Sequence, residues 1–162
     1  MFEALERMSH AVDWMERVRA ARLVARLDPG VSEALVVHLL MDDSTAVAEA
    51  MVAALLSERR ESAIPLILRT LGRRRATGQP LLEDLLNCEL DGVDVRGTIA
   101  SVLIASEDRD EIVGTLSAIA WLAPGGGFPA TPASLARVME LSEHSEEALR
   151  ILAGEALIAL AR

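Results

Sequence analysis

Residues 43–55 read Asp-Ser-Thr-Ala-Val-Ala-Glu-Ala-Met-Val-Ala-Ala-Leu, a turn residue followed by apolar residues at intervals of three and four. Such intervals place the apolar side chains on one face of an amphipathic helix. Counted from Val47, weaker copies of the pattern are anchored at Leu82, Ile112 and Leu149, at spacings of 35, 30 and 37 residues. Each spacing is close to the length of one helix pair, so the pattern predicts an all-α fold of stacked antiparallel helix pairs.

Turn and cap signals divide the chain into short helices, each with one broad apolar side. Asp28, Pro29 and Gly30 are expected to end the second helix, and Ser32 is expected to cap the third. Pro65 falls in the first turn of another helix, where its missing N–H costs little. The predicted helices, about five pairs, cover residues 2–10, 13–27, 33–40, 45–58, 62–71, 81–90, 95–105, 110–122, 132–141 and 146–161.

The second predicted helix carries an apolar stripe and a basic stripe. Arg19, Arg22 and Arg26 are spaced by three and four residues and lie opposite the apolar side. A basic stripe of this kind is usually a solvated face, and in a stacked array it could also line a binding groove. The stripe predicted to face the core consists of Val12, Met15, Val18, Ala21, Leu23 and Leu27.

The composition favours one helical domain over residues 1–162. Apolar residues make up 51% of the chain and aromatic residues only 2%, so Ala, Leu, Val and Ile fill the core. This mixture suits close helix packing better than a sheet. The chain shows no apolar run of about 18 residues and no secretion signal, and its single Cys88 forms no internal disulfide. We therefore expect a cytoplasmic protein without a membrane span.

The charges are distributed unevenly along the chain. All 16 basic residues are Arg, and the absence of Lys indicates the genome bias of a high-GC bacterium. Residues 1–81 contain 11 Arg and 11 acidic residues, whereas residues 82–162 contain 5 Arg and 14 acidic residues and thus carry the whole net charge of −9. This acidic half argues against nucleic acid or an anionic membrane as the partner, and it favours solubility or the steering of a protein partner.

Four segments carry a family resemblance. Residues 63–68 (Ala-Ile-Pro-Leu-Ile-Leu) are typical of a first helix, residues 43–55 and 149–157 of a second helix, and residues 18–27 match more loosely. In these segments the chain resembles the HEAT-repeat family. The resemblance implies a short right-handed α-solenoid that binds a partner, usually a protein, in a groove lined by the second helices. The chain departs from the family pattern at Glu89, an Ala-like position, and in the irregular Gly/Pro loop at residues 123–132.

A basic cluster and an acidic turn are the strongest local charge signals. Arg69 and Arg73, with Arg74 and Arg75, end one predicted helix, where they either stabilise exposed carbonyl groups or contact phosphate or an acidic peptide. Residues 107–111 (Glu-Asp-Arg-Asp-Glu) open another helix. Carboxylates there favour the helix dipole, and the alternative is a site for a cation or a basic partner.

Other potential sites are weaker. His10, His38 and His144 lack the spacing of metal ligands, so we predict neither a metal nor a cofactor. Local motifs suggest no Ser-His-Asp or Cys-His set. Trp121 and Phe128 flank the Gly-rich loop, and Phe128 either pins this loop onto the stack or anchors a partner.

The sequence as a whole predicts a non-catalytic protein–protein interaction module: an adaptor, an assembly factor or an inhibitor-like partner, present as a monomer or homodimer. Two alternatives stay open. One is a HEAT-like enzyme or carrier acting on a small apolar ligand or a modified base, since certain DNA glycosylases and bilin lyases have this architecture. The other is a structural homo-oligomer. The candidate partner-binding residues are Arg19, Arg22, Arg26, Arg69, Arg73, Trp121 and Phe128.

Overall fold

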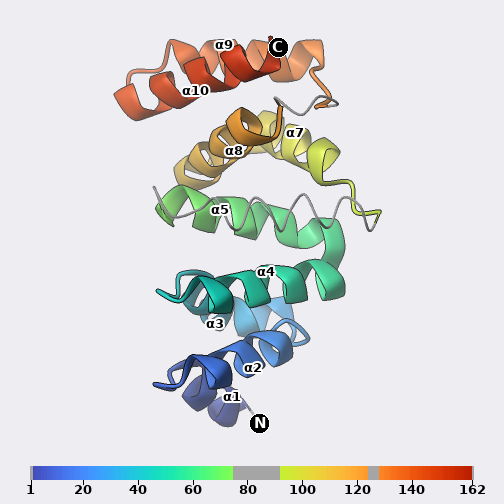
Figure 1. The fold of residues 1–162 in the computed structure, drawn as a ribbon. Helices are drawn as coiled ribbons and strands as arrows, with labels where there is room; N and C mark the ends of the chain where they lie inside the picture. The colour runs from blue at the N-terminus through green and yellow to red at the C-terminus, as the bar shows by residue number, and fades with distance from the viewer. Residues whose placement is uncertain (1, 75–91, 124–127, 162) are drawn as a thin grey trace. The chain divides into compact units, whose positions relative to one another are not determined.

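The computed structural model describes residues 2–74, 92–123 and 128–161, and within these ranges every regular element is helical (Figure 1). The predicted all-α class is therefore confirmed. The helix predicted over residues 81–90 and the Gly-rich centre of the 123–132 loop lie outside the described residues. The contacts group the chain into two units: unit 1 contains residues 2–63 with Gly92 and Val93, and unit 2 contains residues 64–74, 94–123 and 128–161.

Unit 1 consists of α1 (Phe2–Ser9), α2 (Trp14–Val24), α3 (Pro29–Leu40), α4 (Thr45–Arg59) and the short 3-10 helix η1 (Arg60–Ala63). Helix α2 packs against α1, α3 and α4, and α3 also packs against α4. Residues 45–55 of the repeat phrase form the first part of α4, where Val47, Met51 and Leu55 are buried as expected and the two alanines Ala50 and Ala54 are half-buried. The core of unit 1 includes Val24, Val36, Leu39, Leu40, Val47, Met51, Val52 and Leu55.

Helix α3 begins earlier than predicted. Asp28 is its N-cap and accepts a hydrogen bond from the backbone N–H of Gly30 at 2.9 Å, while Pro29 occupies the first turn. Pro suits this position because its fixed φ is helical and the missing N–H would be unpaired in any case. Ser32 lies one turn inside the helix, is buried, and donates its hydroxyl to the Asp28 carbonyl oxygen. The prediction that Ser32 caps the helix was therefore wrong.

The apolar stripe predicted for α2 was right for Ala21 and wrong for Met15 and Leu23. Ala20, Ala21 and Val24 form the buried side, whereas Met15 and Leu23 are half exposed. Small side chains let neighbouring helices approach closely, so the alanines face α1, α3 and α4. The larger apolar residues are consequently left on the solvent side of the helix.

Unit 2 consists of α5 (Ile64–Arg74), α7 (Val95–Ala105), α8 (Arg109–Leu122), α9 (Pro132–Ser142) and α10 (Glu147–Leu160). Helix α8 is central, because it packs against α5, α7 and α10, and α9 packs against α7 and α10. Side chains of Asp94, Asp108 and Thr131 cap the starts of α7, α8 and α9. None of the helices in the described parts of either unit combines the length and apolarity needed to cross a bilayer. The core of unit 2 includes Ile67, Leu68, Ile99, Leu103, Leu116, Ile119 and Val138.

Helices α5 and α8 meet at two glycines. A Cβ atom on Gly72 would lie 1.9 Å from the Asp110 carbonyl oxygen, and one on Gly114 would lie 1.8 Å from the Leu68 carbonyl oxygen. Backbone therefore touches backbone at this crossing, and no other residue type fits without displacing a helix. The sequence pattern predicted that the helix ends before Gly72, but this residue is buried inside α5 because the crossing requires it there.

This crossing predicts how three glycines respond to the same substitution. Gly72→Ala and Gly114→Ala are each expected to lower the free energy of unfolding by about 3 kcal/mol, because the new methyl group collides with backbone that has no rotamer to change. Gly154→Ala in α10 is the control: its Cβ would meet nothing within 4 Å. There the better helix propensity of Ala is expected to raise stability by about 0.5–1 kcal/mol. Urea unfolding followed by circular dichroism measures all three, and equal effects would contradict the close crossing.

Candidate functional site

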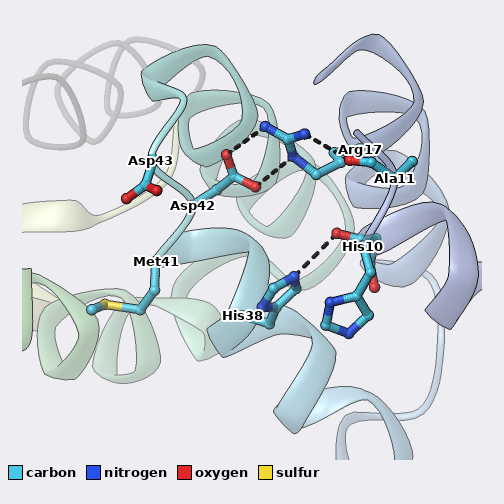
Figure 2. Close-up of a pocket in the computed structure, with 8 residues that line it drawn as sticks. His10, Ala11, Arg17, His38, Met41, Asp42 and Asp43 are labelled. Carbon is cyan, nitrogen blue, oxygen red and sulfur yellow. Dashed lines mark hydrogen bonds and ion pairs between the residues drawn. The ribbon is translucent and has the colours of Figure 1, made fainter. Parts of the chain in front are cut away.

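Arg17 joins two helix connections in unit 1 (Figure 2). Its Nε donates to Asp42 Oδ2 at 2.7 Å and its Nη2 to Oδ1 at 3.1 Å, which makes a two-bond pair. Its Nη1 donates to the carbonyl oxygens of Ala11 and Val12 at 2.7 and 3.0 Å. The two side chains are only 18% and 6% exposed. Arg17 therefore holds the α1–α2 connection against the α3–α4 connection, which is a structural role.

A polar pocket of about 370 Å³ lies beside this pair (Figure 2). The rings of His10 and His38 are 4.1 Å apart between centroids, and His38 Nε2 donates to the Ser9 carbonyl oxygen at 3.1 Å. Within the described residues, no group of three or more His, Cys, Asp or Glu side chains is arranged to hold a metal ion. The polar lining does not favour a small apolar ligand. The lining residues are Ser9, His10, Ala11, Arg17, His38, Met41, Asp42 and Asp43.

Arg59 makes a similar connection elsewhere in unit 1. Its Nη2 donates to the Leu27 carbonyl oxygen at 2.9 Å and to Ser32 Oγ at 2.8 Å, and its Nε donates to the Ala25 carbonyl oxygen at 3.1 Å. The last turn of α4 is thereby joined to the segment between α2 and α3. A guanidinium group thus binds backbone carbonyl oxygens just before α2 and another binds carbonyl oxygens just after it.

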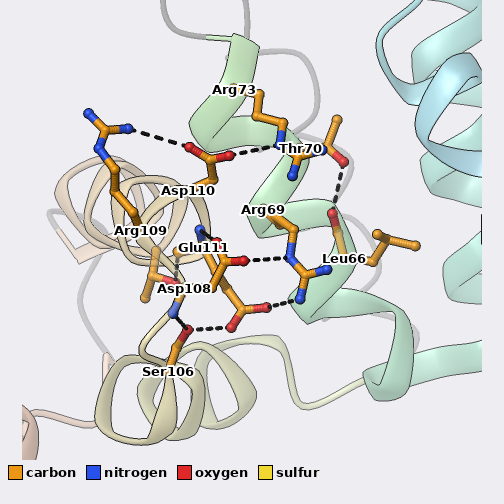
Figure 3. A network of polar contacts seen from close by, with 10 residues as sticks. Leu66, Arg69, Thr70, Arg73, Ser106, Asp108, Arg109, Asp110 and Glu111 are labelled. Carbon is orange, nitrogen blue, oxygen red and sulfur yellow. Dashed lines mark hydrogen bonds and ion pairs between the residues drawn. The ribbon is translucent and has the colours of Figure 1, made fainter.

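In unit 2 the predicted basic cluster and the predicted acidic turn are partners of each other (Figure 3). Arg73 Nε donates to Asp110 Oδ2 at 2.8 Å. Arg69 forms ion pairs with Asp108 at 3.4 Å and with Glu111 at 3.6 Å. Arg73 and Asp110 are 37 residues apart in the sequence, so neither segment by itself indicates that the two side chains meet. The guanidinium groups of Arg69 and Arg73 thus bind the start of α8 within unit 2.

The acidic turn also caps α8. Asp108 accepts a hydrogen bond from the backbone N–H of Glu111 at 3.0 Å, and Ser106 Oγ donates to the buried Glu111 carboxylate at 2.5 Å. Carboxylates in the first turn of a helix are stabilised by its unpaired N–H groups and its dipole. This geometry supports the helix-start interpretation of residues 107–111 over a site for an external cation.

A chain of ion pairs continues from α5 through α8 to α10. Arg109 donates through Nε to Glu146 Oε1 at 3.0 Å and also approaches Asp110 at 3.4 Å. The hydrogen bond from Arg73 lowers the pKa of the Asp110 carboxyl, and the hydrogen bond from Arg109 lowers the pKa of the Glu146 carboxyl. In both cases the guanidinium stabilises the charged form of the acid.

The remaining predicted site residues differ in exposure. Arg26 is exposed and pairs with Glu58 at 2.8 Å. Trp121 and Phe128 are half-buried. Arg19 and Arg22 are exposed on α2 and make no hydrogen bond or ion pair with any residue that the structure describes.

The candidate functional site is the exposed side of α2. Trp14 and Met15 are each 50% exposed and Leu23 is 43% exposed. Tryptophan, methionine and arginine are enriched in protein interfaces relative to other surfaces. The α2 face, as we define it, consists of Met15, Arg19, Arg22 and Leu23, with Trp14 at its N-terminal end.

Sequence reasoning found the arginines of this face and missed its apolar residues. Met15 and Leu23 were assigned to the core because apolar residues on an amphipathic helix usually face inward. The signal that distinguishes the two sides is the adjacent pair Ala20 and Ala21, which marks the side that packs closely. Trp14 directly follows the N-cap Asp13, so it lies in the first turn, where burial is less complete.

Arg17 and Arg26 are expected to contribute unequally to stability, because the Arg17 pair is buried and the Arg26 pair is exposed. Arg17→Met is expected to lower the free energy of unfolding by about 3 kcal/mol, because it removes the guanidinium that neutralises the buried Asp42 carboxylate. Arg26→Met is the control, and the loss of its exposed pair with Glu58 is expected to cost less than about 1 kcal/mol. Chemical denaturation of both variants measures the difference. A mild effect of Arg17→Met would show that the pair is dispensable.

The ion-pair chain in unit 2 predicts acid sensitivity. The folded pKa values of Asp110 and Glu146 lie below their ordinary values of 3.8 and 4.5. Their stabilising contributions are thus complete above those values and are lost as the pH falls through the lower folded pKa values. We expect the thermal midpoint to fall on acidification below pH 4.5 and this fall to be smaller in Glu146→Gln. Glu155→Gln, an exposed change on the neighbouring helix α10, should keep the wild-type profile.

Comparisons of the chain with models of known families, with curated proteins and with solved structures found no match. The resemblance to HEAT repeats and the solenoid arrangement therefore stay predictions.

Proposed function

We propose that this protein is a non-catalytic protein-binding module and that the α2 face is its partner-binding surface. The observation that carries the proposal is the combination, on one helix side, of half-exposed apolar residues with the two exposed arginines Arg19 and Arg22, which lack a described partner. Other arginines of unit 1 already bind acceptors within that unit, namely Arg17, Arg26 and Arg59. Arg19 and Arg22 are thus the arginines of α2 that are available to bind another molecule.

The chemistry of the face favours a protein with an acidic segment that also carries apolar side chains. Burying the exposed halves of Met15 and Leu23 would contribute about 1 kcal/mol each. Arginine forks bind carboxylates with two parallel hydrogen bonds, which adds specificity to this modest apolar term. A nucleic acid is a poorer match, since the chain carries a net charge of −9 and the α2 face offers only two such cations.

The rigid setting of α2 supports recognition without a change in its backbone. Ala20, Ala21 and Val24 are fully buried, and Arg17 and Arg59 bind near the two ends of the helix. A preorganised surface loses little conformational entropy when a partner binds. In the HEAT-repeat resemblance α2 is the second helix of its pair, the position that lines the binding groove in that family.

The proposal predicts which substitutions weaken partner binding. The partner is captured from extracts of the native cells with the wild-type protein, identified, purified and titrated by calorimetry. Arg19→Glu combined with Arg22→Glu is expected to weaken binding at least tenfold, because two attractive charges become repulsive. Met15→Ser and Leu23→Ser are expected to weaken it less, through lost apolar burial.

Two control variants match these changes outside the α2 face. Arg7→Glu reverses an exposed charge on α1 and is compared with Arg19→Glu alone, and Val31→Ser removes a 60% exposed apolar residue on α3 and is compared with Met15→Ser. Both controls are expected to bind as the wild type does. If all the α2 variants keep the wild-type affinity, the partner binds elsewhere and the proposed surface is wrong.

A further inference from the structure

A second exposed helix side in the molecule is apolar and acidic. On α10, Ile151 and Ile158 are 55% and 58% exposed, and Glu147 and Glu155 are exposed with them. These four residues follow one another at intervals of three and four, so they share one side of the helix. The buried residues of α10 lie on its other side and include Leu149, Ala153 and Ala156. The α10 face, as we define it, consists of Glu147, Ile151, Glu155 and Ile158.

The α10 face and the α2 face are complementary in charge and similar in spacing. Met15 and Leu23 are eight residues apart, or about 12 Å along a helix, and Ile151 and Ile158 are seven residues apart, or about 10.5 Å. Arg19 and Arg22 lie between the first two, and Glu155 lies between the second two. Two helices that pack along this length therefore bring apolar residues together and place arginines against glutamates.

The α10 face also permits a close approach. Gly154 lies beside Ile151 and Ile158 on this side of the helix, and a Cβ atom on it would meet nothing within 4 Å. A glycine on an exposed helix side leaves the backbone open to a neighbouring helix, as Gly72 and Gly114 show inside unit 2.

We infer that the α2 face of one molecule binds the α10 face of a second copy of the same chain. The inference rests on the proposed function in that it uses the same α2 face, and it adds the identity of one occupant. The contact joins two different surfaces, so a bound pair still presents one free face of each kind: the α10 face of one copy and the α2 face of the other. Association through such a contact continues from copy to copy unless the geometry closes a ring.

The size of the contact determines how strong this association is. One helix side against another buries less surface than stable protein–protein complexes require. The association is therefore weak and depends on protein concentration. It also depends on salt, because the arginines and glutamates involved are exposed to solvent and are screened by ions.

Sedimentation velocity of the full chain over a concentration series, at low and at high salt, tests the inference. The wild type is expected to show an average mass that rises with concentration at low salt and returns to the monomer value at high salt. Arg19→Glu/Arg22→Glu makes both faces acidic, and Glu147→Arg/Glu155→Arg makes both faces basic. Each variant alone is expected to associate at least tenfold more weakly than the wild type, because like charges then face each other.

An equimolar mixture of these two variants is the decisive measurement. In the mixture the acidic α2 face of one variant meets the basic α10 face of the other, and the reverse contact retains the wild-type charges. Association is therefore expected to return in the mixture, and only contacts between molecules can restore it. Circular dichroism of each variant checks that both are folded. Ile151→Ser removes an apolar residue of the α10 face and is expected to weaken association. Its control is Ile104→Ser, which removes a 48% exposed residue on α7 and should associate as the wild type does.

Three results would overturn the inference: a wild type that stays monomeric at every concentration at low salt, variants that associate as the wild type does, or a mixture that stays monomeric. None of these affects the partner titration described above. If self-association fails while Arg19→Glu/Arg22→Glu still weakens partner binding, only the self-association is rejected. If the α2 variants change neither measurement, the proposed function of this face fails as well.

Discussion

Within each unit, hydrogen bonds from arginine side chains to helix ends and connecting segments hold the helices in place. In unit 1, Arg17 and Arg59 bind backbone carbonyls between successive helices. In unit 2, Arg73 binds a carboxylate in the first turn of α8, and Arg109 binds the carboxylate of the α10 N-cap residue. The core that surrounds these contacts is made of Ala, Leu, Val and Ile, whose packing has little directional preference. The planar guanidinium fork is directional, so it determines which helix ends meet.

This internal use of arginine changes how the charges of the chain are understood. A basic cluster beside an acidic turn suggests two external partners when each is considered alone, yet Arg73 and Asp110 neutralise each other within unit 2. On the exposed side of α2, the basic residues that remain are a smaller set, Arg19 and Arg22, next to exposed apolar side chains. Only charges that are not already paired within the fold are available to a partner, and these are fewer than the composition indicates.

The sequence predicted the helices well and their sides and partners less well. The bounds of α4, α7 and α8 agree with prediction within a residue or so, because caps such as Asp108 and the apolar repeat are local signals. The buried side of α2 depends on which neighbours it meets, and nothing near Met15 in the chain reveals them. The pairs Arg17–Asp42 and Arg109–Glu146 join residues 25 and 37 positions apart, so only the folded chain shows that they meet. The candidate site was accordingly half predicted: its arginines followed from spacing, and its apolar residues did not.

The contact between Gly72 and Gly114 has a consequence for the history of this protein. Each glycine leaves no room for a side chain against the other helix, so a change at either position has to be accompanied by a shift of the whole α5–α8 crossing. Exposed residues outside the proposed binding faces, such as Ile104 on α7, are under no such restriction and are free to diverge. A distant relative is therefore better recognised by two small residues about 42 positions apart, one near the end of a helix and one in the first half of a later helix, than by its charges or its overall identity.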